Sequence, residues 1–117
     1  MKELEEREKG FERKYRRDQE VAFKAKIRCA KLLAQWAAGQ LGLQDAAADA
    51  LIRAAIDTAF ADSGNSAVVN RLADAFAAKK MRVTHDMVRV EHDRLLVVAR
   101  QQLIGEIETD KQAISPE

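Results

Sequence analysis

The near absence of proline is the feature that most restricts how this chain can fold. Its single proline, Pro116, is the penultimate residue, and only five of its 117 residues are glycine. Proline breaks helices and glycine weakens them, whereas the abundant Ala, Leu, Lys, Arg and Glu favour them. In a chain of this length, such a composition predicts a single helical domain with a modest core.

Apolar residues recur at steps of three and four from residue 21 onward, the pattern of helices that pack by one face. No alternating run predicts a strand. We expect a four-helix domain over residues 21–112. Its predicted core residues are Phe23, Ile27, Ala30, Leu33, Ala34, Trp36, Ala37 and Leu41, then Leu51, Ile52, Ala55, Ile56, Ala59 and Phe60, then Val68, Val69, Leu72, Ala73 and Phe76, then Val88, Leu95, Leu96, Ala99, Leu103 and Ile107.

Residues typical of helix ends divide this domain. Gly42 predicts the stop of its first helix, while Asp45 and Thr84 predict the N-caps of its second and fourth. The connections are short, so neighbouring helices should pack side by side. The predicted fold class is therefore all-α and four-helix bundle-like, with long first and last helices and a flexible tail over residues 113–117.

Residues 1–20 differ from the rest because they carry seven basic and seven acidic side chains but few apolar ones. Several opposite charges stand four residues apart, and each such pair stabilises a helix by about 0.2–0.5 kcal/mol. Gly10 costs that helix roughly 0.5–1 kcal/mol relative to alanine. We expect a charged, marginally helical and mobile segment that is frayed or disordered when the protein is alone.

The apolar residues of this segment fall on one helical stripe, since Leu4, Phe11 and Tyr15 are spaced by seven and then four. The stripe could extend the first core helix and pack on the bundle. A thin apolar face among many charges equally suits insertion into a groove on another protein.

Net charge, the lengths of apolar runs and the single cysteine argue against several classes of protein. A third of the residues are charged, yet the net charge is only +1, which argues against a nucleic-acid binder. No apolar run approaches the ~20 residues that span a bilayer, so no direct membrane insertion is expected. The N-terminus lacks the apolar core of a signal peptide. Cys29 is the only cysteine, which fits a reducing, cytoplasmic location.

Residues able to support catalysis or bind metal are few. His85 and His92 are seven apart, whereas zinc ligands on a helix more often stand three or four apart. We interpret them as surface histidines and Cys29 as a semi-buried helix residue. A small metal- or thiol-dependent enzyme is the alternative, but no catalytic, cofactor-binding or metal residue is predicted. One basic cluster is a solvated face or a site for phosphates or an acidic partner: Lys24, Lys26, Arg28 and Lys31.

Several sequence segments resemble the zeta subunit family, the ATPase inhibitors of alphaproteobacterial F1Fo-ATP synthases. The resemblance covers nearly the whole chain and is most specific in the first forty residues. The matching residues there are Phe11-Glu12-Arg13-Lys14-Tyr15, Asp18, Glu20, Phe23-Lys24, Arg28, Lys31-Leu32-Leu33, Trp36-Ala37-Ala38 and Leu41-Gly42-Leu43. In two departures from the family pattern, Leu4 stands where the family usually has Phe, and Gly10 replaces an Ala.

This resemblance implies a regulatory subunit that is not an enzyme and needs no cofactor. In the family, the mobile N-terminal segment enters a catalytic interface between the alpha and beta subunits of F1, near the gamma shaft. It becomes helical there and blocks rotation in the direction of hydrolysis, as the mitochondrial inhibitor does on a different fold. Carried onto this chain, the resemblance implies these inserting residues: Leu4, Arg7, Glu8, Phe11, Glu12, Lys14, Tyr15 and Asp18.

The same resemblance implies a cytoplasmic protein that is monomeric when free and peripheral to the inner membrane through F1. The alternative within this family is a weakly inhibitory or non-inhibitory helical binding module, acting as a nucleotide sensor or an assembly factor.

Overall fold

The computed structural model describes the backbone of residues 2–62, 64 and 66–114, and the side chains of residues 9–10, 12–62, 64 and 66–110. This part consists of four helices without a strand: α1 (Lys2–Leu41), α2 (Asp45–Ala61), α3 (Ser66–Ala78) and α4 (His85–Ile114). The predicted all-α fold with long first and last helices is confirmed. Of the predicted tail, residues 113 and 114 belong to α4, and residues 115–117 lie outside the described part.

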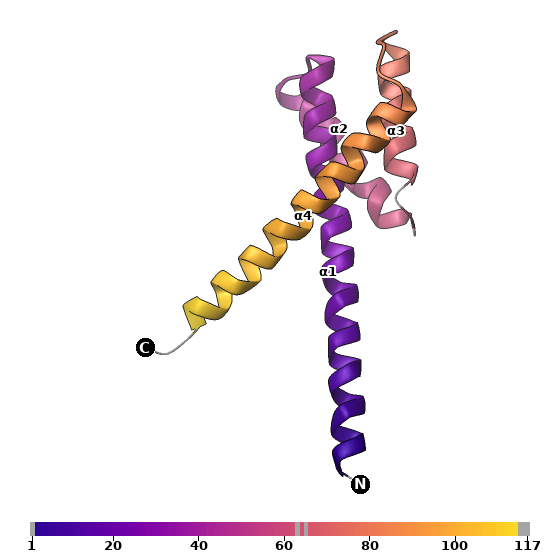
Figure 1. Cartoon of the computed structure of the whole chain (residues 1–117). Coiled ribbons are helices and arrows are strands. Elements are labelled where there is room, and N and C mark those ends of the chain that lie inside the picture. The colour runs from indigo at the N-terminus through magenta and orange to yellow at the C-terminus, as the bar shows by residue number, and fades with distance from the viewer. Residues whose placement is uncertain (1, 63, 65, 115–117) are drawn as a thin grey trace.

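The two long helices cross, and the two short helices pack around their crossing halves (Figure 1). The N-terminal half of α1 and the C-terminal half of α4 project from this bundle and diverge (Figure 1). The molecule measures 64 × 34 × 21 Å, with a radius of gyration of 18.2 Å. A compact domain of this length would have a radius of about 13 Å, so the shape is strongly elongated.

Small side chains on the C-terminal half of α1 form the centre of the core. Ala25, Cys29, Ala34 and Ala37 are completely buried there. The larger buried side chains come from α1, α3 and α4 and fill the space around them: Leu33, Val69, Leu72, Phe76 and Val88. The ring of Trp36 packs edge-on against Phe76, with 5.6 Å between the ring centroids, as its predicted place beside the core requires.

Two predicted core residues, Phe23 and Phe60, are instead exposed, by 46% and 57%. Phe23 lies just before Ala25, where burial of α1 begins, and Phe60 is the penultimate residue of α2. At this end of the bundle no described helix covers them. The two rings pack against each other in a T-shaped pair, with 5.6 Å between centroids. Helical periodicity identified their face correctly but could not show where the covering helices end.

The helix ends follow local sequence at two of the three predicted positions. Gly42 adopts a left-handed backbone with φ of 71°. The N–H groups of Gly42 and Leu43 donate to the carbonyls of Gly39 and Ala38, which together form a Schellman stop. The Thr84 hydroxyl accepts the Met87 N–H at 3.2 Å and so caps α4.

The predicted cap at Asp45 is wrong. Gln44 occupies the N-cap position of α2 without a side-chain cap, and Asp45 is already the first residue of the helix, with φ of 51°. Its carboxylate lies in the first turn of α2, where negative charge is favourable to the helix dipole.

A second Schellman stop ends α3, but its left-handed residue is lysine. The N–H of Met81 donates to the Phe76 carbonyl at 3.1 Å, and the N–H of Lys80 donates to the Ala77 carbonyl at 2.9 Å. Lys80 has a φ of 55°. A residue with a Cβ atom pays about 1–2 kcal/mol in this conformation, whereas glycine does not.

We therefore expect Lys80→Gly to raise the free energy of unfolding by about 1 kcal/mol, after the larger entropy of glycine in the unfolded chain is subtracted. Urea unfolding followed by circular dichroism measures this gain. Lys80→Ala is the matched control, since it removes the charge but keeps the Cβ atom. Equal stability of the two variants would contradict the backbone explanation.

Candidate partner-binding site

The first half of α1, residues 2–20, projects from the bundle and is called the arm below. Its described side chains, at residues 9–10 and 12–20, are all exposed. The arm joins the buried part of α1 without a break in the helix. The structure thus shows the arm as helix, while its mobility in solution and its separation from a domain over residues 21–112 stay predictions.

The eight predicted inserting residues all lie on α1. The side chains of four of them lie outside the described part: Leu4, Arg7, Glu8 and Phe11. The side chains of the other four are exposed: Glu12, Lys14, Tyr15 and Asp18. Tyr15 is 64% exposed, and its hydroxyl accepts a 2.7 Å hydrogen bond from the amide of Gln19. An aromatic ring is therefore held on the arm with most of its surface in water.

The stripe of the arm continues the buried face of α1. A step of seven residues returns to nearly the same side of a helix, so Tyr15 lies almost directly in line with Ala22 and Cys29. Cys29 is completely buried, Ala22 is exposed and Tyr15 is exposed. The arm therefore extends the core face beyond the helices that cover it.

A groove separates the arm from the projecting half of α4, a neighbour that the sequence did not reveal. It is an open groove of about 490 Å³. Lys14 and Asp18 line it, so the structure brings two of the predicted inserting residues together there. Val21 contributes apolar surface from α1, and Ile104 and Ile107 contribute it from α4.

An ion pair joins the two long helices near the base of the arm. The guanidinium of Arg28 binds both carboxylate oxygens of Glu106, at 2.7 and 2.8 Å. The hydrogen bonds raise the pKa of Arg28 and lower the pKa of Glu106. Both groups thus remain charged at neutral pH, and the pair links the projecting half of α4 to α1.

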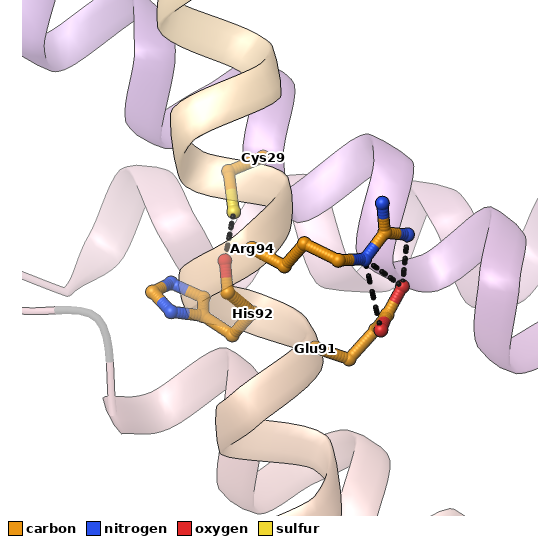
Figure 2. A network of polar contacts seen from close by, with 4 residues as sticks. All are labelled: Cys29, Glu91, His92 and Arg94. Atoms are coloured by element: carbon orange, nitrogen blue, oxygen red, sulfur yellow. Dashed lines mark hydrogen bonds and ion pairs between the residues drawn. The ribbon is translucent and has the colours of Figure 1, made fainter.

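The thiol of Cys29 is completely buried and donates to the main-chain oxygen of His92 at 3.4 Å, not to its imidazole ring (Figure 2). Burial, together with the charge of Asp93, raises the pKa of this thiol to about 12. A thiol rather than a thiolate is present at neutral pH, so Cys29 has neither the base nor the ionisation that a nucleophile needs.

The two histidines do not form one site. His92 is buried, with 6% exposure, and its Nδ1 lies 3.0 Å from Asp93, so its predicted surface position is wrong. His92 stands four residues after Val88 on the inner face of α4, which explains its burial. His85 is exposed and bonds Asn70. Within the described residues, acidic, histidine and cysteine side chains nowhere gather in threes that could hold a metal ion.

A charged helical arm whose described side chains are all exposed has the form by which one protein can place a helix in a groove of another. The sequence profile of the ATPase inhibitor subunit zeta family matches residues 1–102, and the chain therefore belongs to this family. The family name implies ATPase inhibition, a regulatory rather than catalytic role, and binding to the F1 part of ATP synthase. Comparisons with curated proteins and with solved structures gave no significant match. None of the described helices has the length and hydropathy of a membrane span.

The buried thiol makes stability depend on pH in the alkaline range. Below pH 9.0, the ordinary pKa of the thiol, it is protonated in both the folded and the unfolded chain. Above that pH, only the unfolded chain loses the proton readily, so unfolding becomes favoured by about 1.4 kcal/mol per pH unit until the folded pKa is reached.

We expect the stability difference between wild type and Cys29→Ala to shift against the wild type by about 2 kcal/mol between pH 9 and roughly pH 10.5. Urea unfolding at each pH measures it, and the comparison isolates the thiol because the two proteins differ only at Cys29. Parallel stability curves for the two proteins would show that the thiol ionises without unfolding.

Proposed function

We propose that the arm binds at a catalytic interface between the alpha and beta subunits of F1, near the gamma shaft, and blocks ATP hydrolysis. One observation carries this proposal: every described side chain of the arm is exposed, in a chain that belongs to a family of ATPase inhibitors. A helical segment whose described side chains are all exposed contributes little packing to its own bundle. Its surface is available to a partner.

Apolar contact would supply much of the affinity. Removing roughly 100 Å² of the Tyr15 ring from water would contribute about 2.5 kcal/mol. Leu4 and Phe11 share its stripe by their spacing in the sequence. The stripe is the natural face to enter a groove, since it continues the face by which α1 already packs.

Charge would set the register of the inserted helix. Glu12, Lys14 and Asp18 surround Tyr15 with both signs of charge, and all three are exposed. Arg7 and Glu8 extend this pattern along the sequence. Charged groups at an interface favour one alignment over its neighbours and speed association more than they add to affinity. The arm would therefore bind F1 in one register.

The proposed partners are the alpha, beta and gamma subunits, which such an interface brings together. The protein would be a cytoplasmic monomer when free and peripheral to the inner membrane when bound to F1. Gly10 is the residue of the arm that disfavours a helix most. Substitutions at this position should change the strength of inhibition without altering the bundle.

Titration of purified F1-ATPase with the full chain should lower the hydrolysis rate, and a version lacking residues 1–19 should not. Tyr15→Ala should raise the half-inhibitory concentration at least about tenfold, because most of the ring is lost. Val97→Ala is the matched control, since Val97 is an apolar residue with 56% exposure that belongs to α4 and not to the arm. Binding of the full chain without inhibition would support the non-inhibitory module instead.

Gly10→Ala should strengthen inhibition about two- to fivefold. Alanine favours a helix over glycine by roughly 0.5–1 kcal/mol, which a marginal arm gains when it orders on F1. A Cβ atom added at Gly10 meets nothing within 4 Å in the free protein, so the substitution is sterically allowed.

The matched control for this change is Gly39→Ala, another exposed position where an added Cβ atom meets nothing within 4 Å, but on the half of α1 that packs in the bundle. It should leave the half-inhibitory concentration unchanged. Equal potency of Gly10→Ala and wild type would mean that helix formation in the arm does not limit binding.

A further inference from the structure

Phe23 and Phe60 form an exposed aromatic ridge that the fold does not explain. The rings come from α1 and α2 and pack at 65° to each other, yet about half of each remains in water. Exposed aromatic pairs on rigid helices are typical of the central residues of protein interfaces. The arm does not include this ridge, so the proposed insertion leaves it unused.

Open apolar grooves flank the ridge on both sides. One has a volume of about 600 Å³, and Ala22 and Leu96 contribute apolar surface to it. The other has a volume of about 360 Å³, with Ile27, Ile56 and Leu103 among its lining residues. A ridge between two grooves complements the surface of a helix, whose side chains form ridges of their own. The shape therefore fits a partner helix better than a small ligand.

The charge around these grooves is strongly one-sided. The two grooves are lined by only one acidic residue, Asp62, and by five basic residues: Lys24, Lys26, Arg28, Lys31 and Arg100. The whole chain has a net charge of only +1, so positive charge is concentrated here. The basic cluster seen in the sequence therefore surrounds the aromatic ridge and does not form an independent solvated face.

Some of these cations already have partners within the chain. Lys24 pairs with Glu20 at 3.0 Å, and Arg28 pairs with Glu106. Lys26 donates to the main-chain oxygen of Asp62. Lys31 and Arg100 form no ion pair among the described residues, and both are exposed. They flank the ridge from α1 and α4, where carboxylates of a partner could meet them.

We propose that the ridge, its two grooves and their basic rim bind an acidic amphipathic helix of F1, as a second contact beside the arm. The inference rests on the proposed function, because it takes F1 as the partner. Tyr15 and Phe23 are eight residues apart on one continuous helix, a rise of about 12 Å. A partner that surrounds the arm would meet the ridge directly.

The two contacts would have different roles. The ridge uses groups already held in the bundle, so it can bind without a large ordering cost. Once it is bound, the arm is held close to its site at a high effective concentration. Loss of the ridge should therefore weaken binding, while the arm that remains still inhibits fully at saturation.

The test compares the F1 affinity and the saturating inhibition of full-length variants. Phe60→Ala should weaken binding at least about tenfold in biolayer interferometry on immobilised F1, with unchanged inhibition at saturation. Lys31→Glu should weaken binding at low salt and flatten its salt dependence, since opposite charges are screened by salt. Val97→Ala and Arg71→Glu are the matched controls for apolar area and charge. Thermal unfolding would verify that each variant is folded.

Three outcomes would overturn the inference. If wild type inhibits F1 but Phe60→Ala and Lys31→Glu bind as tightly as their controls, the second contact is wrong and the arm proposal stands. If wild type does not bind F1, both proposals fail. If inorganic pyrophosphate shifts the NMR signals of Lys31 and Arg100 while Phe60→Ala leaves F1 affinity unchanged, the surface binds phosphate and not an acidic helix.

Discussion

The small side chains on one face of α1 are the feature on which the rest of the structure depends. Ala25, Cys29, Ala34 and Ala37 carry almost no bulk, so helices can approach the α1 backbone closely, and α2, α3 and α4 all pack against this one helix. The volume is supplied by their neighbours, above all Leu72 and Phe76 of α3. A larger residue at Cys29 would collide with the main chain of α4, whose His92 carbonyl already accepts its thiol.

The position where this packing ends explains both surfaces proposed to bind a partner. Burial on α1 begins at Ala25, α2 stops at Ala61, and α4 turns away after it crosses α1. Before Ala25, the described side chains of α1 are therefore exposed, apart from the half-buried Val21. The arm and the aromatic ridge are neighbouring consequences of one geometric fact: α1 is much longer than the helices available to bury it.

The sequence predicted the helices and most of the core because both follow from local patterns. Low proline and three- and four-residue spacing predicted the helices, and Gly42 and Thr84 correctly marked the end of the first and the start of the fourth. What it could not predict depended on where helices meet in space. His92 is buried, and Phe23 and Phe60 are exposed, because of the lengths and crossing of α1, α2 and α4, which no local pattern encodes.

The same distinction applies to the site. The sequence placed Tyr15 and the charges around it on one helix, and the structure leaves them exposed. It did not reveal that Lys14 and Asp18 share a groove with α4, or that Arg100 lies near the basic cluster of α1, since these residues are distant in the chain. The Schellman stop at Lys80 was also missed, because the sequence signal for that turn is glycine.

The unbroken backbone of α1 has a mechanical consequence. The arm and the buried half of the helix share one hydrogen-bond ladder, without a hinge between them. A force applied to a seated arm would pass along the helix axis as through a stiff rod and twist or pull the whole bundle. With the arm bound, the arm and the bundle would move as one body. Release would then require the arm to leave its groove along the helix axis, or the helix to unfold one turn at a time.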